Sequence, residues 1–294
     1  MRDPIAIDPA AGARPCCPDG FSDTGGEAIT YDYLCFEQRG PLGIVTLNRP
    51  EKLNALSPEL LGELHTLFLS LGNDLATRVI LLRGAGRAFC AGADLASSAL
   101  APPGPGRAQR QMAMQKLASG IVAAMRACPQ PIVALLKGPV CGGGFSLALA
   151  ADVRIATPDT RMNVANLKVG LGGPDMGSGY FLPRLIGWSA ASALMLTGDF
   201  LLAERAYQLG LVAEIAEAGH LDAAGEEWAA RMLTASPMGL RLTKHHLNQL
   251  IDCNGLAAAL ALEDAQQTLL LETADHREAV AAFLEKRPPA YRDQ

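Results

Sequence analysis

The stretch Val140-Cys-Gly-Gly-Gly-Phe-Ser-Leu-Ala-Leu-Ala-Ala-Asp152 places three glycines between two apolar segments. The short apolar run at residues 132–137 predicts a buried strand, and the Ala- and Leu-rich residues after the glycines favour a helix. At a helix start the backbone N–H groups are unpaired, and the helix dipole adds partial positive charge. Glycine also removes the Cβ that would keep a ligand away. The stretch therefore predicts a strand–turn–helix unit whose turn can hold a polarised oxygen.

A second glycine turn, Gly84-Ala-Gly-Arg-Ala-Phe-Cys-Ala-Gly-Ala-Asp-Leu95, follows another apolar segment at residues 78–83. Two such turns side by side would offer two N–H donors to one oxygen, which is the arrangement of an oxyanion hole. Close backbone packing without chemistry is the simpler interpretation, and the residues alone leave both open. A nucleotide-phosphate loop is disfavoured, because neither a third fingerprint glycine nor a Gly-Lys-Ser/Thr ending is present.

Strand-like and helix-like segments alternate along the rest of the chain. Residues 31–38 and 42–48 predict a β-hairpin, and Ser57 before Pro58 predicts a helix start. This alternation predicts an α/β fold with largely parallel strands. Residues 1–30, rich in Pro, Gly, Asp and Ala, are expected to form a flexible N-terminal arm. Residues 220–286 are expected to form three or four helices.

Composition excludes several classes of protein. The chain of 294 residues has a formal net charge of −5 and no basic stripe, so nucleic acid is not an expected partner. No apolar run reaches the roughly 18 residues of a membrane-spanning helix. Seven cysteines without paired spacing, and no secretory signal, indicate a cytoplasmic protein. The five histidines have no metal-ligand spacing, so no metal site is expected.

Several motifs together resemble the enoyl-CoA hydratase/isomerase (crotonase) superfamily. They include Asn48-Arg-Pro-Glu-Lys-Leu-Asn-Ala-Leu56, Phe89-Cys-Ala-Gly-Ala-Asp-Leu95 and the glycine run ending at Asp152, and they continue as Leu194-Met-Leu-Thr-Gly198 and Phe283-Leu-Glu-Lys-Arg287. The resemblance covers residues 31–290. It implies a crotonase-like spiral of ββα units over residues 31–218, followed by a helical oligomerisation region at 219–294. The implied assembly is a homo-oligomer, a trimer or a dimer of trimers.

The resemblance also implies a substrate and a site. The substrate would be an acyl thioester of coenzyme A, as in fatty acid metabolism, with no permanently bound cofactor. Its carbonyl oxygen would accept hydrogen bonds from the N–H groups of Ala93 and Gly143, which would stabilise an enolate. For the basic residues among the implied coenzyme A contacts, the alternative is that each is only a solvated surface charge. These contacts are Lys52, Leu53, Ala55, Arg87, Ala91, Asp94, Leu95 and Lys286.

The two glutamates with which hydratases of this family work are replaced. Alignment on the glycine run and on Val169-Gly170 places Ser146 and Asn166 at these positions. Both side chains can hydrogen-bond a water molecule, but neither can take up a proton near neutral pH. We therefore expect double-bond isomerisation or an atypical hydration. The alternatives are a thioester hydrolase, a carbon–carbon lyase, or an acyl-CoA binder without catalysis.

Asp175 is the one acid near the site in sequence, within Gly172-Gly-Pro-Asp-Met-Gly-Ser-Gly179. The resemblance implies an acid/base role, as in the dienoyl-CoA isomerases. The alternative is that Asp175 caps a helix starting near Met176. A dehalogenase role is disfavoured, because no histidine occurs at residues 108–139 and no tryptophan lies beside Asp175. Cys90 and Cys141 flank the two turns without a neighbouring base, so we expect small buried side chains and not nucleophiles.

Overall fold

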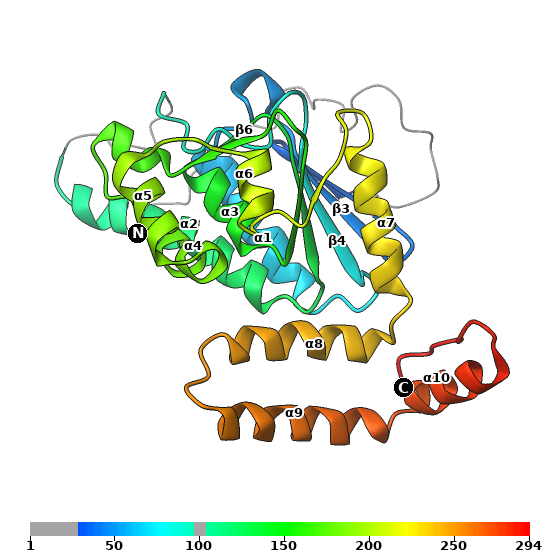
Figure 1. Ribbon diagram of the computed structural model, residues 1–294. Coiled ribbons are helices and arrows are strands. Elements are labelled where there is room, and N and C mark those ends of the chain that lie inside the picture. Colours follow the sequence, from blue (N-terminus) through cyan, green and yellow to red (C-terminus); the bar gives the residue numbers. More distant parts are fainter. Residues whose placement is uncertain (1–28, 97–103) are drawn as a thin grey trace, which may run out of the picture.

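A seven-stranded sheet organises the residues that the computed structural model describes, 29–96 and 104–294 (Figure 1). The first three strands of the sheet pair antiparallel, and the remaining pairs are parallel. The antiparallel pairing confirms the predicted hairpin. The first strand begins two residues before the predicted core boundary, and residues 1–28 of the predicted arm lie outside the described residues. In sheet order the strands are β1 (Ile29–Thr30), β2 (Leu34–Arg39), β3 (Leu42–Leu47), β4 (Val79–Gly84), β5 (Ile132–Leu136), β7 (Val153–Ala156) and β10 (Glu214–Ile215).

Both faces of the parallel strands are covered, which explains why these strands are continuously apolar. Along β4, Ile80 and Leu82 face a core beneath α1 and α2, whereas Val79 and Leu81 face a second core beneath α7. Ser57 caps α1 as predicted, because its hydroxyl accepts the N–H of Leu60. The helices are α1 (Pro58–Leu71), α2 (Arg107–Ala127), α3 (Gly143–Ala150), α4 (Ser178–Ile186), α5 (Trp188–Thr197), α6 (Ala203–Gln208) and α7 (Leu221–Leu233), with 3-10 turns η1 (Pro50–Lys52) and η2 (Ala165–Val169).

A second, three-stranded sheet was not predicted from the sequence. It consists of β6 (Pro139–Cys141), β8 (Arg161–Asn163) and β9 (Leu201–Leu202), which are too short to show a pattern. The chain passes from β5 to β6 through Lys137 and Gly138 alone. Gly138 has φ +55°, and a Cβ on it would lie 2.2 Å from the Arg87 carbonyl oxygen. This bend requires glycine, and it turns the chain out of the large sheet toward the glycine run.

Helix α3 is buried along its whole length. Arg154, itself buried, donates hydrogen bonds to the carbonyl oxygens of Ala148 and Ala151 where the helix ends, at 3.3 and 2.7 Å. Burial lowers the pKa of Arg154 to about 10, so the side chain is still a cation at neutral pH. The carboxyl end of α3 is therefore neutralised inside the protein, and its amino end starts at the glycine run.

The C-terminal helices form a separate layer below the sheet (Figure 1). They are α8 (Pro237–Leu250), α9 (Leu256–Leu271) and α10 (Ala274–Glu285), so residues 220–286 form four helices with α7. Lys244 attaches α8 to the core: its buried ammonium lies 3.1 Å from Asp152 and donates to the carbonyl oxygens of Met125 and Gln130. Within the described ranges, no helix is both long and apolar enough to cross a membrane.

Replacing Lys244 by methionine should destabilise the fold by about 3 kcal/mol, because two buried carbonyl oxygens lose their charged donor and the half-buried Asp152 carboxylate keeps only Arg126 as its cation. Urea unfolding measures the change. The exposed Lys116 on α2 provides the control, since its replacement by methionine should stay within about 0.5 kcal/mol. Equal midpoints for the two variants would contradict this role of Lys244.

Candidate active site

The two glycine turns are in direct backbone contact. A Cβ on Gly92, which has φ +95°, would lie 2.8 Å from the Cys141 carbonyl oxygen and 3.6 Å from the Gly142 Cα. Gly142 also has positive φ, at +50°. No side chain fits between these peptides, so glycine at Gly92 is what allows the two turns to approach. A bridge between Cys90 and Val140 holds the segments together just before the turns.

Each turn presents a free N–H group. Leu56 donates to the Gly92 carbonyl and accepts from the Asp94 N–H, at 2.8 and 3.0 Å, so the Ala93 peptide N–H between them points away from Leu56. Gly143 is the first residue of α3, where the helix provides no acceptor. Considering residues 29–96 and 104–294 only, neither N–H has a hydrogen-bond acceptor. The turns therefore carry two unused donors close to each other.

Buried polar side chains hold the first turn in place. The Asn54 amide donates to the carbonyl oxygens of Ala85 and Ala88, both at 2.9 Å, and accepts the Arg49 N–H. Arg49 in turn pairs with Asp94 at 2.9 Å, directly after Ala93. Asp94, expected as a coenzyme A contact, is thus a buried partner of Arg49 beside the first glycine turn.

The segment around Asp175 reaches the same place. The sulfur of Met176 lies 3.1 Å from the position that a Cβ on Gly143 would take. Ser146, on the first turns of α3, donates its hydroxyl to the Asp175 carbonyl oxygen at 2.9 Å. The structure therefore brings Ser146 and Asp175, predicted separately from the sequence, next to the second glycine turn.

Of the two roles considered for Asp175, the alternative of a helix cap is not what the structure shows. The helix is α4, it starts at Ser178, and its N-cap is Gly177 without any side-chain cap. The Asp175 backbone exchanges hydrogen bonds with Ser178 instead: its N–H donates to the Ser178 hydroxyl, and its carbonyl oxygen accepts the Ser178 N–H. The Asp175 carboxylate accepts a hydrogen bond from the side-chain amide of Gln115 on α2. This partner was missed because it lies 60 residues earlier in the chain.

Asn166 also lies at the second turn. Its side-chain oxygen is 3.2 Å from the position of a Cβ on Gly142, and its amide nitrogen donates to the Gly173 carbonyl at 3.5 Å. Ser146 is almost fully buried, and its hydroxyl serves the carbonyl oxygens of Asp175 and, at 3.5 Å, Gly142. The two positions predicted to replace the glutamates are therefore adjacent to the turns.

The cysteines beside the turns are not activated. Burial raises the pKa of Cys90 to about 12, and its thiol donates to the Asn54 carbonyl oxygen at 3.0 Å. Burial also raises the pKa of Cys141, which is half-buried. Both thiols are protonated at neutral pH, as predicted. Cys90 has a packing role, since a Cβ on Gly144 would lie 2.6 Å from the Cys90 Cβ.

The predicted coenzyme A contacts are partly brought together. Ala91 donates its N–H to the Leu53 carbonyl oxygen at 3.0 Å, and Leu53 and Arg87 line one surface hollow of about 320 Å³. Lys52 and Leu95 are exposed, and Ala55 is buried under Arg49. Lys286 is the C-cap residue after α10, and α10 lies in the C-terminal layer, apart from α3 (Figure 1). In the described part of the chain, no three His, Cys, Asp or Glu side chains gather into a metal site.

These features define a protein of the crotonase fold. The crystal structure of an enoyl-CoA hydratase from Bacillus anthracis matches with a TM-score of 0.83 at 30% identity, over 89% of this chain and 100% of that chain. The family model "Enoyl-CoA hydratase/isomerase" matches residues 37–294. The chain therefore belongs to the enoyl-CoA hydratase/isomerase family.

Two curated relatives have different names. The protein named "Probable enoyl-CoA hydratase echA12" of Mycobacterium leprae is 37% identical over 253 residues, which is 85% of this chain and 86% of that protein. The "1,2-epoxyphenylacetyl-CoA isomerase" of Escherichia coli is 35% identical over 247 residues, 84% of this chain and 93% of that protein. Membership of the family thus leaves the reaction to be argued from the residues.

Replacing Gly92 by alanine should lower kcat/KM for an acyl-CoA substrate by about 10²–10³-fold, because the methyl group forces the Ala93 N–H away from Gly143. Steady-state kinetics measures the loss. Gly210→Ala is the matched control: Gly210 also has positive φ, at +76°, but open space around its missing Cβ. That variant should lose stability and keep its activity, whereas an unchanged rate in Gly92→Ala would contradict the contact's importance.

Proposed function

We propose that the chain is an acyl-CoA isomerase that stabilises a thioester enolate with the N–H groups of Ala93 and Gly143. Asp175 takes a proton from one carbon of the acyl chain and returns it to another, which shifts a double bond. The observation that carries this proposal is the pair of unused N–H groups on two turns in backbone contact. The substrate class follows from the family.

The chemistry needs a fixed oxyanion site more than it needs many side chains. An enolate is a poor species in water, but two preorganised donors lower its free energy because they do not have to reorient. A double-bond shift adds and removes nothing, so one carboxylate suffices to carry the proton. Hydration additionally requires a group that activates water, and neither Ser146 nor Asn166 can accept the proton. The residues therefore favour isomerisation over the ordinary hydratase reaction.

The names of the relatives support two versions of the proposal. The isomerase of Escherichia coli favours a rearrangement of the acyl group, whereas the hydratase name of echA12 favours an atypical hydration in which Asp175 acts alone. A thioester hydrolase or carbon–carbon lyase would use the same two donors with Asp175 directing water. An acyl-CoA binder without catalysis would use the donors alone.

Replacing Asp175 by asparagine should lower kcat for isomerisation of a 3-enoyl-CoA by about 10²–10⁴-fold, because the proton carrier is gone. The absorbance of the conjugated 2-enoyl product follows the reaction, and calorimetry should find thioester binding unchanged. Efficient hydration of crotonyl-CoA by the wild type, or full isomerase activity in this variant, would contradict the proposal. Binding without turnover of any enoyl or dienoyl thioester would indicate the binder.

Gln115→Leu serves as the companion variant. It removes the donor to the Asp175 carboxylate but retains the carboxylate itself. Since Gln115 acts only by orienting Asp175, we expect a fall of about tenfold in kcat with KM unchanged. Gln115→Asn, with its shorter side chain, should recover part of the rate if water fills the gap.

The assembly is proposed to be a trimer or a dimer of trimers. The C-terminal layer exposes large apolar side chains: Leu256, Phe283 and Leu284 are 76, 83 and 74% exposed, and along α9 only Gln266 is buried. Such a surface is typical of a subunit interface. Packing of α10 on a neighbouring copy would also bring Lys286 to that copy's ligand.

Sedimentation equilibrium should therefore give about three or six times the chain mass of 30.9 kDa. Phe283→Asp should shift the population toward monomer, because it places a charge in the apolar contact. Val169, which is exposed on η2, provides a control, and its replacement by aspartate should leave the mass unchanged. A wild-type mass near 31 kDa at high concentration would refute the assembly.

A further inference from the structure

Met176 lies between Asp175 and helix α4 in a backbone conformation that a residue with a Cβ rarely adopts. Its φ is +45°, and Gly177 after it has φ +82°. This left-handed region is unfavourable for most residues other than glycine, because the Cβ crowds the following carbonyl oxygen. Met176 is only 6% exposed, so its side chain points into the protein. A buried, strained methionine beside a candidate catalytic acid indicates a functional position.

Hydrogen bonds immediately before and after Met176 hold this conformation. The Ser146 hydroxyl donates to the Asp175 carbonyl oxygen at 2.9 Å, and the Asp175 N–H donates to the Ser178 hydroxyl at 3.0 Å. Glycine would adopt the same backbone without strain. The strain therefore points to a use for the methionine side chain itself.

The Met176 side chain covers Gly143, one of the two proposed oxyanion donors. Its Sδ lies 3.1 Å, and the Leu56 Cδ1 2.9 Å, from the position that a Cβ on Gly143 would take. Leu56 is 4% exposed, and both side chains belong to the main apolar core. Gly143 is therefore enclosed between a methyl group and a thioether, neither of which donates a hydrogen bond.

The polar side chains nearest to this enclosure have protein partners. The Ser146 hydroxyl bonds to the carbonyl oxygens of Asp175 and Gly142, and the Asn166 amide bonds to a backbone carbonyl. A buried water needs two to four polar partners. A water beside Gly143 would find the N–H group, but Leu56 and Met176 would offer it no good hydrogen bond. The enclosure therefore disfavours water at the donor.

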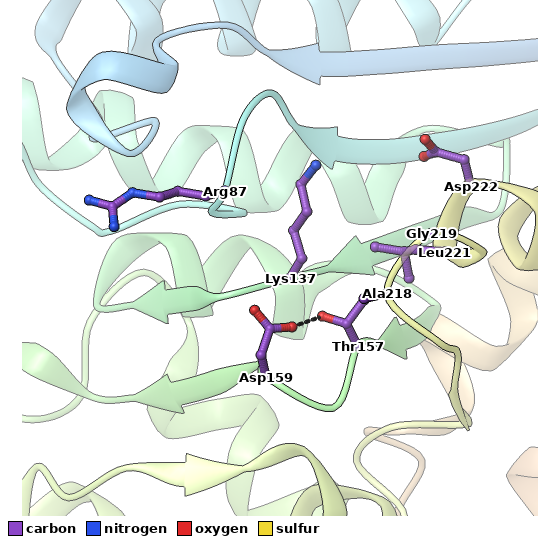
Figure 2. Close-up of a pocket in the computed structure, with 8 residues that line it drawn as sticks. All are labelled: Arg87, Lys137, Thr157, Asp159, Ala218, Gly219, Leu221 and Asp222. Carbon is purple, nitrogen blue, oxygen red and sulfur yellow. Dashed lines mark hydrogen bonds between the residues drawn. The ribbon is translucent and has the colours of Figure 1, made fainter.

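A hollow at the ends of β5, β7 and β10 has walls of the opposite character (Figure 2). Its volume is about 240 Å³, and both cations and carboxylates line it. Water readily enters such a place, because charged groups are costly to desolvate. The charged residues of its wall are Arg87, Lys137, Asp159 and Asp222. The fold thus has a charged, hydrated surface hollow and, separately, an apolar enclosure at Gly143.

We propose that Met176 determines the specificity of the reaction by keeping water away from the Gly143 N–H group. The proposal rests on the isomerisation proposed above and adds the residue that prevents hydration. Without a competing water, the thioester oxygen alone accepts the Gly143 N–H, and the low dielectric strengthens that bond. No water is then placed to add to the conjugated double bond. The acyl group leaves as the isomerised thioester and not as a hydroxyacyl thioester.

Replacing Met176 by alanine removes the thioether and its methyl group, which leaves room for a water. Asp175 then takes a proton from this water while the water oxygen bonds to C3, and the proton goes to C2. The sum is one water added across the C2–C3 double bond, with no oxidant or reductant. The variant should therefore acquire the atypical hydration in which Asp175 acts alone.

Initial rates of the full-length protein with a 3-enoyl-CoA, in water enriched in oxygen-18, test the proposal. Mass spectrometry separates the 2-enoyl product from the labelled 3-hydroxyacyl product. We expect Met176→Ala to raise the hydroxyacyl fraction about tenfold. Met176→Leu, which conserves the volume, should keep the wild-type fraction.

Met125→Ala is the matched control for lost packing. Met125 is fully buried on α2, where its carbonyl oxygen contacts Lys244. The control should lose stability in thermal unfolding but keep the wild-type product ratio. Equal hydroxyacyl fractions in Met176→Ala and Met125→Ala would overturn the proposal.

Met176→Gly keeps the test decisive where alanine at this positive φ does not fold. Glycine relieves the backbone strain and removes the same thioether. It should raise the hydroxyacyl fraction at least as much as alanine does. A folded Met176→Gly with the wild-type fraction would equally overturn the proposal.

Infrared difference spectra of bound butyryl-CoA, with carbon-13 at the thioester carbonyl, separate this proposal from the proposed isomerisation. Butyryl-CoA has no double bond, so its carbonyl stretch reports the donors without turnover. We expect the wild type to lower the wavenumber and Met176→Ala to return it toward the value in solution. If the wild type isomerises no thioester but the band still moves in Met176→Ala, the isomerisation fails and the water exclusion stands. Equal bands in the two proteins would overturn the role of Met176.

Discussion

The contact between the peptides of Gly92 and of Cys141-Gly142 is the constraint on which the rest of the structure depends. Backbone groups approach this closely only where no Cβ intervenes, and they stay there only if neighbouring segments prevent the turns from relaxing apart. The bridges from Leu56 to Ala93 and from Cys90 to Val140 provide that restraint, one for each side of the contact. The small second sheet adds to this restraint, because its strand β6 leads directly into the glycine run.

Helix α3 is a buried helix whose two ends differ in their hydrogen-bond partners. Its eight residues are all buried, so every polar group at its ends needs a partner or a function. Arg154 meets the carbonyl oxygens at the carboxyl end and compensates the negative end of the dipole. The N–H groups at the other end have no such partner, and this asymmetry concentrates hydrogen-bonding capacity at Gly143. The amino end of α3 therefore presents its first N–H group beside the first glycine turn.

Local features were predictable from the sequence, and contacts between distant segments were not. The hairpin, the buried parallel strands and the Ser57 cap depend on residues a few positions apart, and all three predictions are confirmed. Gln115 at Asp175 and Lys244 at Asp152 join segments far apart in the chain, so no spacing announces them. The alternative of an Asp175 cap fails for a related reason. Ser178 and Gly177 form the start of α4, and a pattern of capping residues could not decide between neighbouring candidates.

Residue 146 is in direct contact with the segment that carries Asp175. Ser146 is 1% exposed, and its hydroxyl ties the Asp175 carbonyl oxygen to the first turns of α3. A glutamate here would point its carboxylate at that same carbonyl oxygen, which cannot donate a hydrogen bond, and burying the charge would be costly. The turn around Met176 would have to move away from Gly143 to admit it. In this chain, the close packing of the Asp175 segment therefore favours a small neutral side chain at position 146.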